Sequence, residues 1–308
     1  LRLASELGPL AQLTRFASGS TSYNAEYAIK KGLPELRVNS NLSGLALNLP
    51  APLSKTADAT LPLRIEQLAL PDSKPARTTA MPLEQWRVDL GQVFSLAFVL
   101  DNSGKTARVV RGGIAMGLGG DEQLGLPEAG VVANIRLPRI DVDAWERALA
   151  QPGPARPNTR TSGGSDDAVA GLPASAQAYL PTSLALRADE LLVDRRQLND
   201  VVAGGSRDGL TWRANIDARE LNGYAEYRQG TAGNPGRVYA RLARLTLAPS
   251  TVNDFEALLE EQPATVPALD IAVDDFELRG KRLGRVEIEA INRGGTGNEP
   301  REWRLNKF

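Results

Sequence analysis

Apolar and polar residues alternate with a period of two along most of this 308-residue chain. The clearest rows lie in 94–100, 131–137, 212–218 and 285–290. Successive side chains of a β-strand point to opposite faces, so each row predicts a strand with one apolar and one polar or mixed face. Such strands are typical of antiparallel sheets that expose one face to water. The sequence therefore predicts a mostly β protein.

Several predicted strands change the parity of their apolar positions partway along. The apolar positions shift across Ser43-Gly44 and again across Asp274-Asp275. One extra residue in a strand produces such a shift, so we expect β-bulges at both places. Bulges bend and twist a sheet, and their recurrence predicts a strongly twisted and curved antiparallel sheet.

Two short helices and one linker interrupt the expected strands. A capping residue precedes each predicted helix, over 142–150 and over 251–260. The stretch 151–179 is rich in Pro, Gly, Ser and Thr, which is typical of a flexible linker or a long surface loop. We therefore expect a first β segment over 1–150 and a second over 180–308 that ends within a repeat.

The second segment contains a weak internal repeat. The stretch 184–201 matches 269–286 at constant spacing, and a Pro precedes each copy. Trp-Arg pairs begin at Trp86, Trp212 and Trp303. We infer a unit of several strands plus one short helix, repeated about every 90 residues, as in elongated arrays whose units bury their faces against neighbours.

Composition narrows the possible functions. The 36 Lys and Arg residues balance 37 Asp and Glu residues, whereas nucleic-acid binders normally carry a clustered basic excess. The chain has no Cys and no His, which removes disulfides, the usual zinc ligands and the commonest general base. No run of about 18 apolar residues predicts a membrane span. We expect no enzyme, and neither catalytic residues, a metal nor a cofactor.

Adjacent acidic residues occur at Asp274-Asp275 and at the matching Asp189-Glu190. Paired carboxylates can perform acid–base chemistry, but neighbours along a strand face opposite ways and make a poor catalytic pair. We favour a bulge in contact with water at both places. The Trp-Arg pairs could bind polysaccharide, but a core Trp beside an Arg on the wet face is the commoner arrangement.

The apolar faces of the predicted strands are the candidate site. Most of this surface must form a core, yet two short helices cannot cover so many strands. Large exposed apolar surface usually marks a binding site, and an acyl chain gains about 0.8 kcal/mol per buried CH₂. The candidate lipid-lining residues are Phe94, Leu96, Phe98, Ile135, Leu184, Leu186, Ile216, Leu269, Ile271, Val273, Val286 and Ile288.

Short motifs are spread over 266–290 with 303–306, over 49–55 with 61–64, and over 137–145. Together they resemble the YhdP type of AsmA-like envelope proteins. The resemblance implies a Gram-negative inner-membrane protein whose long sheet crosses the periplasm as a taco-like, repeating β-groove. It also implies phospholipid transport to the outer membrane, an N-terminal anchor helix and no catalytic residues. Because the sequence shows no such anchor, we expect an internal fragment of a longer protein.

Three functions are compatible with these expectations. The favoured one is a lipid conduit that binds phospholipid or another acyl-chain lipid and supports outer-membrane integrity. Its further expected partners are the inner membrane, through an anchor outside this chain, and outer-membrane or periplasmic proteins, but not nucleic acid. The alternative is a non-catalytic structural or protein-interaction scaffold that binds partners by strand addition. A carbohydrate-active enzyme would need converging carboxylates, which the sequence does not indicate.

Overall fold

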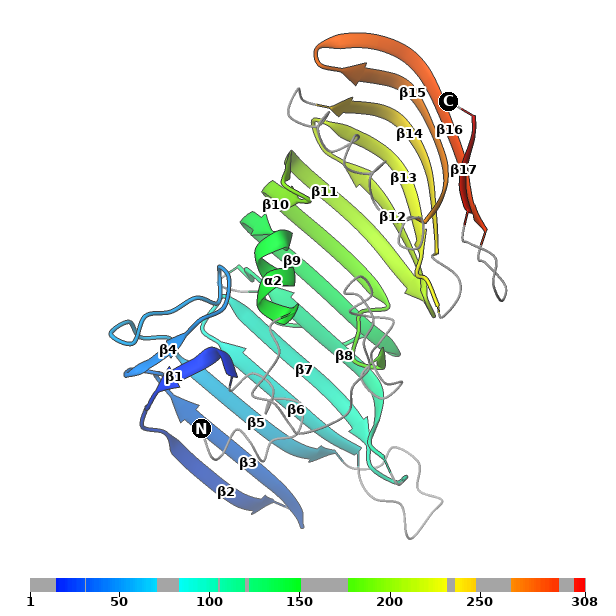
Figure 1. Ribbon diagram of the computed structural model, residues 1–308. Helices are drawn as coiled ribbons and strands as arrows, with labels where there is room; N and C mark the ends of the chain where they lie inside the picture. Colours follow the sequence, from blue (N-terminus) through cyan, green and yellow to red (C-terminus); the bar gives the residue numbers. More distant parts are fainter. Residues whose placement is uncertain are drawn as a thin grey trace. The chain divides into compact units, whose positions relative to one another are not determined.

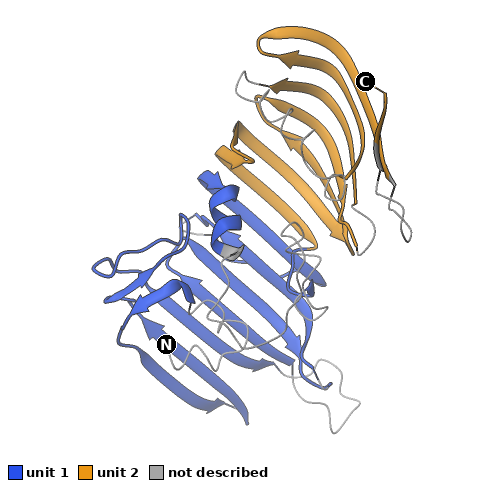
Figure 2. Ribbon diagram, in the orientation of Figure 1, with its two compact units in different colours: residues 1–161, 174–181 blue, residues 162–173, 182–308 orange. Residues whose placement is uncertain are grey.

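The computed structural model describes residues 15–30, 32–70, 83–104, 106–119, 122–150, 177–231, 236–247, 267–293 and 302–307. Most of these residues form β-strands, as the alternation predicts (Figure 1). The chain forms two compact units (Figure 2). Among the described residues, the first unit holds those up to 150 together with 177–181, and the second holds those from 182 onward.

The main sheet of the first unit consists of β2 (Asn24–Lys30), β3 (Leu33–Ser40), β5 (Leu63–Leu70), β6 (Leu83–Leu90), β7 (Phe94–Asp101), β8 (Arg108–Met116) and β9 (Gly130–Asp141). Their spatial order is β9-β8-β7-β6-β5-β3-β2. Neighbouring strands are antiparallel except β8 and β9, which are parallel. A separate small sheet pairs β1 (Ala17–Gly19) with β4 (Leu45–Leu47).

The sheet of the second unit consists of β10 (Ser183–Val193), β11 (Arg196–Asp208), β12 (Thr211–Asp217), β13 (Leu221–Arg228), β14 (Arg237–Leu247), β15 (Ala268–Leu278), β16 (Lys281–Arg293) and β17 (Glu302–Lys307). These strands are neighbours in chain order. All pairs are antiparallel except β14 and β15, which are parallel. Among the described strands, neither unit's sheet closes on itself.

The fold-class prediction is confirmed, with one addition: each unit contains a parallel pair. A parallel pair needs a crossover that returns the chain to the same end of the sheet. In the first unit this crossover joins β8 to β9, and its Leu124 is buried against Ala97 and Ala115 on the sheet. The crossover therefore covers part of β7 and β8 on the sheet face that carries Ala97 and Ala115.

One α-helix is found among the described residues, α2 (Val142–Ala150), at the predicted position. Asp141 Oδ1 accepts a hydrogen bond from the backbone N–H of Ala144 at 2.7 Å, which is the expected N-cap. The expected helix over 251–260 and the expected linker up to residue 176 lie outside the described residues.

Register shifts accompany bending of the strands in the second unit. The pairing of β15 with β16 shifts between Val273 and Phe276, which confirms the bulge predicted at Asp274-Asp275. The pairing of β13 with β14 shifts at Gly223. Figure 1 shows β12 to β16 as strongly bent ribbons, in agreement with the general effect of bulges on strand direction.

Two other predicted bulges are not found. At Ser43-Gly44 the chain leaves β3 in a turn and enters β4, which belongs to another sheet, so the parity change marks a change of sheet. At Asp189-Glu190 the register of β10 and β11 is the same on both sides. Asp200, which the register places opposite Asp189, takes a φ of 52° while the register on both sides is kept.

The internal repeat corresponds to two equivalent hairpins, β10–β11 and β15–β16. The first turns at Asp194-Arg195, with φ values of 50° and 60°. The second turns at Arg279-Gly280, with φ values of 54° and 74°. Two successive positive φ angles are typical of the type I′ turn, whose twist matches that of the flanking strands. The two copies therefore share their turn geometry as well as their sequence pattern.

Candidate functional site

The apolar face of the second unit contains every lipid-lining residue predicted there. In a sheet, residues opposite each other on neighbouring strands share a face, so the register identifies this face directly. One row crosses seven successive strands: Leu186, Ala203, Ile216, Gly223, Leu242, Val273 and Val286. A parallel row consists of Leu184, Gly205, Ala214, Ala225, Ala240, Ile271 and Ile288. Leu269 lies between Val238 and Ala290 in a third row.

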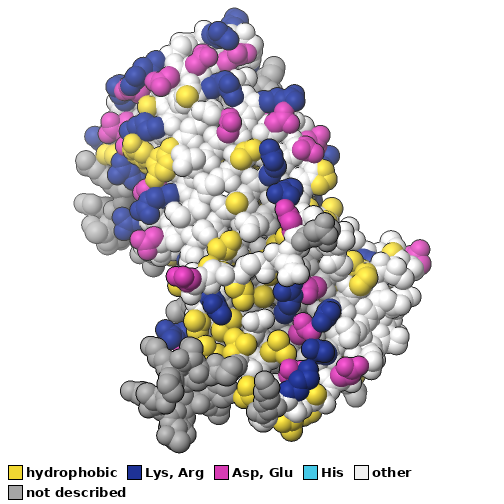
Figure 3. All heavy atoms as spheres, turned by 180° about the vertical axis from the view of Figure 1, so that it is seen from behind, with side chains coloured by type: hydrophobic (Ala, Val, Ile, Leu, Met, Phe, Trp, Pro, Cys, Tyr) yellow, Lys and Arg dark blue, Asp and Glu magenta, His cyan; other side chains and the backbone are white. Residues whose placement is uncertain are grey.

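The opposite face of the second unit is polar and carries several ion pairs. Asp270 accepts from Arg237 at 2.9 Å and from Arg241 at 2.8 Å, and the Arg241 hydrogen bond is the main cause that lowers the pKa of Asp270. Arg213 pairs with Glu226 at 3.0 Å. Figure 3 shows Lys, Arg, Asp and Glu side chains spread over this unit, in the upper part of the view. The sheet therefore separates apolar from charged side chains between its two faces.

The first unit also has an apolar face with continuous cross-strand rows, although its opposite face carries the buried cluster of Ala97, Ala115 and Leu124. Its central apolar row consists of Val38, Ile65, Val88, Leu96, Ile114 and Ala133, one residue from each of six successive strands. A second row on the same face consists of Leu63, Leu90, Phe94, Met116 and Ile135. Phe98 belongs to the same face, opposite Trp86 and Gly112. All four residues predicted for this unit therefore share one face.

A tyrosine from 177–181 packs on this face. The ring of Tyr179 meets that of Phe98 edge-on, with 5.0 Å between ring centroids and 77° between ring planes. Such an edge-to-face pair is a favoured aromatic geometry. Burial raises the pKa of the Tyr179 hydroxyl. Tyr179 thus covers part of the apolar face around Phe98.

The predicted lining residues differ in how far they are buried. Phe98 and Val273 are buried, whereas the other ten are half-buried. The largest fully buried side chains are Val99, Val131, Val201 and Val273. Leu, Ile and Val side chains that keep part of their surface accessible can still pack against an added hydrocarbon chain. This face can therefore offer hydrophobic contact to such a chain.

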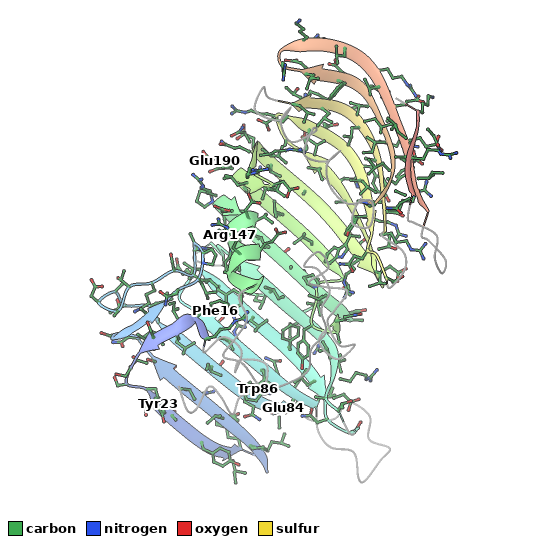
Figure 4. The ribbon with its side chains drawn as sticks, viewed as in Figure 1. Phe16, Tyr23, Glu84, Trp86, Arg147 and Glu190 are labelled. Atoms are coloured by element: carbon green, nitrogen blue, oxygen red, sulfur yellow. The ribbon has the colours of Figure 1, made fainter. Side chains whose placement is uncertain are left out.

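Polar side chains bound the apolar face at one end of the first unit. Glu84 and Trp86 lie on the same face of β6 (Figure 4), two residues apart. Glu84 accepts hydrogen bonds from the side-chain amides of Gln67 and Asn102. The apolar surface around Trp86 therefore gives way to a satisfied polar cluster at Glu84.

The Trp-Arg pairs that begin at Trp86 and Trp212 divide between the two faces, as the commoner interpretation predicts. Trp86 packs beside the core cluster of Val38, Ile65 and Val88. Arg87, on the opposite face, pairs with Asp89 at 2.9 Å. Trp212 and Arg213 divide in the same way, because Trp212 faces Tyr227 and Arg213 faces Glu226. These pairs therefore mark strand faces.

The adjacent acidic residues do not converge on a site. Asp274 is exposed and lies 3.4 Å from Arg285, an ordinary surface pair. Within the described residues, no group of three or more acidic side chains could hold a metal ion. No helix in that part of the chain is both long and apolar enough to cross a membrane.

Sequence reasoning missed several members of the apolar face. Val238, Ala240 and Leu242 of β14 alternate with Arg237, Tyr239 and Arg241, and this alternation would have identified them. Trp86, Val88 and Ile114 carry the same signal. Their cross-strand neighbours could not be predicted, because these depend on the register between strands and the pattern of a single strand does not determine that register.

A family model described as YhdP protein matches residues 3–307, nearly the whole chain. Neither the curated proteins nor the solved structures include a significant match.

Proposed function

Because this chain belongs to the YhdP protein family, we propose that it binds phospholipid acyl chains along the apolar faces of its two units. The observation that carries the proposal is the continuous cross-strand row from Leu186 to Val286, whose side chains are mostly half-buried. A methylene group gains about 0.8 kcal/mol on leaving water for such a surface. A row across many strands suits a long, unbranched chain better than a compact ligand.

Family membership supports the cellular setting of the proposal. The chain would be a periplasmic segment of an envelope protein anchored in the inner membrane of a Gram-negative bacterium. It would contribute to phospholipid transport between the inner and outer membranes, and so to outer-membrane integrity. The role is non-catalytic, since hydrophobic contact alone holds and guides the lipid.

Neighbouring residues on opposite faces of β12 provide the test. Ile216 lies on the apolar face and Asn215 on the polar face, so Ile216→Glu and Asn215→Glu add the same charge to the two sides. We expect Ile216→Glu to remove the share of recovered lipid that is bound to the second unit, because a carboxylate is costly to cover with hydrocarbon. Asn215→Glu should leave it unchanged. Mass spectrometry of organic extracts measures the bound lipid.

Circular dichroism of the same variants separates binding from folding. If Ile216→Glu keeps its β spectrum and loses lipid, the apolar face is an accessible binding surface. If the variant unfolds, or if the unaltered chain carries no lipid at a stoichiometric level, the face is an ordinary core and the proposal fails.

The edge of the first unit favours a second candidate function, a protein-interaction scaffold. Every residue of β2 is exposed, and Tyr27 and Ile29 are 69% and 68% exposed on the apolar face. Among the described strands, none pairs with the outer edge of β2. An exposed edge can accept an extended segment of a partner. Loss of crosslinking to envelope proteins in Ile29→Lys, with lipid binding retained, would favour this function.

A further inference from the structure

A cavity of about 800 Å³ lies in the first unit, where the connection between β3 and β5 meets the turn between β6 and β7. Leu49, Leu61 and Val93 supply apolar parts of its wall, and Ser54 and Thr60 supply hydroxyl groups. Ligand sites in proteins are typically cavities of this size, mostly apolar with a few placed polar groups. The cavity therefore has the size and the lining of a small-ligand site.

Lys55 is the one charged residue among the described residues of this wall, and it is only 8% exposed. Its Nζ donates hydrogen bonds to the carbonyl oxygens of Leu45 at 2.6 Å and Thr56 at 2.9 Å. An ammonium group has three N–H donors, so these two acceptors leave one. Within the described part of the chain, no carboxylate lies within ion-pair distance of Nζ.

A buried ammonium without a counter-charge is costly, and a bound anion would offset that cost. The charge of Lys55 acts on one nearby acid, Asp58. The pKa of Asp58 is lowered mainly by a hydrogen bond with the Thr56 hydroxyl and to a smaller extent by Lys55. Asp58 is exposed and forms no ion pair with Lys55. Asp58 therefore does not neutralise Lys55 through an ion pair.

The cavity lies at the end of the apolar face. Val93 immediately precedes Phe94, which begins β7 and belongs to the apolar row of Leu90 and Met116. Backbone hydrogen bonds from Gly91 to Pro62 at 2.7 Å and from Gly117 to Val93 at 3.2 Å fix the turn there. A ligand bound beside Lys55 would therefore be close to apolar surface.

We propose that this cavity binds the anionic phosphate of an amphiphile, that Lys55 contacts the phosphate, and that the alkyl chain lies on the adjoining apolar wall. The inference rests on the proposed function and adds to it a headgroup preference and a place where the headgroup is held. A free inorganic phosphate would satisfy the charge but would leave the apolar part of the wall without a partner.

Three probes separate these chemistries when titrated calorimetrically into the whole 308-residue chain: octyl phosphate, 1-octanol and inorganic phosphate. We expect octyl phosphate to bind about tenfold more tightly than octanol, because a charge-assisted hydrogen bond adds to the same alkyl contact. Inorganic phosphate should bind more weakly than either alkyl probe. Octyl phosphate binding no tighter than octanol would overturn the inference, as would inorganic phosphate binding as tightly as octyl phosphate.

Variants assign the effect to the cavity. Lys55→Gln keeps a donor for the two carbonyls but removes the charge, and should weaken octyl phosphate about tenfold while leaving octanol unchanged. Thr60→Glu places a carboxylate at an exposed position of the wall, so it should weaken octyl phosphate without disturbing Lys55. The matched control is Lys30→Gln, which removes an exposed lysine paired with Glu35.

Unchanged octyl phosphate affinity in both Lys55→Gln and Thr60→Glu would overturn the headgroup site. Equal weakening by Lys30→Gln would also overturn it, because the effect would then be one of overall charge. Octanol binding without any preference for octyl phosphate leaves the proposed function standing and removes only this inference. Absence of binding by both alkyl probes would instead count against the proposed function itself.

Discussion

Gly112 sets the position of the Phe98 ring on the apolar face of the first unit. A Cβ atom at Gly112 would lie 2.3 Å from Cδ1 of Phe98, far inside van der Waals contact. Phe98 is buried and already packs against Tyr179, so its ring cannot move without losing that contact. We expect Gly112→Ala to lower the free energy of unfolding by roughly 1–3 kcal/mol.

Urea denaturation of Gly112→Ala tests this expectation against a matched control. Gly204 also lies within a strand, β11, but a Cβ atom there meets nothing within 4 Å. Gly204→Ala should therefore be neutral or slightly stabilising, because it removes the backbone entropy cost of glycine. Equal destabilisation by the two substitutions would show that contact with Phe98 is not the cause.

Glu287 makes the pairing of β16 with β17 sensitive to pH. Hydrogen bonds from Lys307 and Arg285 lower the pKa of the Glu287 carboxyl to about 2. An acid whose pKa is lower in the folded state stabilises that state above its unfolded-state pKa, and the contribution is lost as pH falls through the folded pKa. Stabilisation by Glu287 should therefore be complete above about pH 5 and fade toward pH 2.

Amide hydrogen exchange in β17 between pH 6 and pH 2, corrected for intrinsic exchange rates, measures this effect. We expect protection of β17 to fall with pH in the unaltered chain and to change less in Glu287→Gln. High salt should reduce the difference, because Glu287, Arg285 and Lys307 are solvent-accessible and their charges are screened. A pH dependence of equal size in Glu287→Gln would assign it to other groups.

At the scale of strands, the two-residue alternation was enough to predict which face each side chain lies on. It was not enough to predict which strands pair, or in which direction. Ile271, Val273 and Ile288 share a face as expected, because the strand geometry fixes the side-chain period. The parallel pairing of β14 with β15 could not be predicted, since direction depends on the crossover and not on the strand pattern.

Local chemistry outside the strands was harder to predict. The parity change at Ser43-Gly44 has the same sequence signature as a bulge, yet there the chain passes from one sheet to another. Lys55 lies in a stretch rich in Pro, Ser, Thr and Ala without periodicity. The buried Lys55 ammonium donates to the carbonyl oxygens of Leu45 and Thr56, and the contact with Leu45, ten residues away, exists only in the folded chain.

The repeated hairpins allow a test of turn geometry. Gly280 takes a φ of 74°, and a Cβ atom there would meet nothing within 4 Å. Gly280→Ala should therefore cost about 1 kcal/mol of unfolding free energy through backbone strain alone. Lys281→Ala, at the adjacent exposed position, should stay within about 0.5 kcal/mol. Chemical denaturation measures both, and an unchanged stability in Gly280→Ala would contradict the assigned turn.

At the scale of the whole molecule, each unit has an apolar face of its own. Leu96 lies in the central apolar row of the first unit and Ile216 in that of the second. If each face binds lipid by itself, Leu96→Glu and Ile216→Glu should each remove part of the bound lipid, and the double variant should remove nearly all of it. Independent sites give such additive losses.

Quantitative lipid extraction from the four proteins, the unaltered chain, the two single variants and the double variant, measures this additivity. Asn134→Glu combined with Asn215→Glu is the control, because both asparagines are exposed on the faces that do not carry the predicted lining residues, opposite Ala115 and Gly204. That control adds two negative charges yet should keep the full lipid load. Complete loss of lipid in either single variant would show that lipid needs both faces at once. Binding would then not be a property of each unit by itself, and the repeat would be the unit of sequence but not of binding.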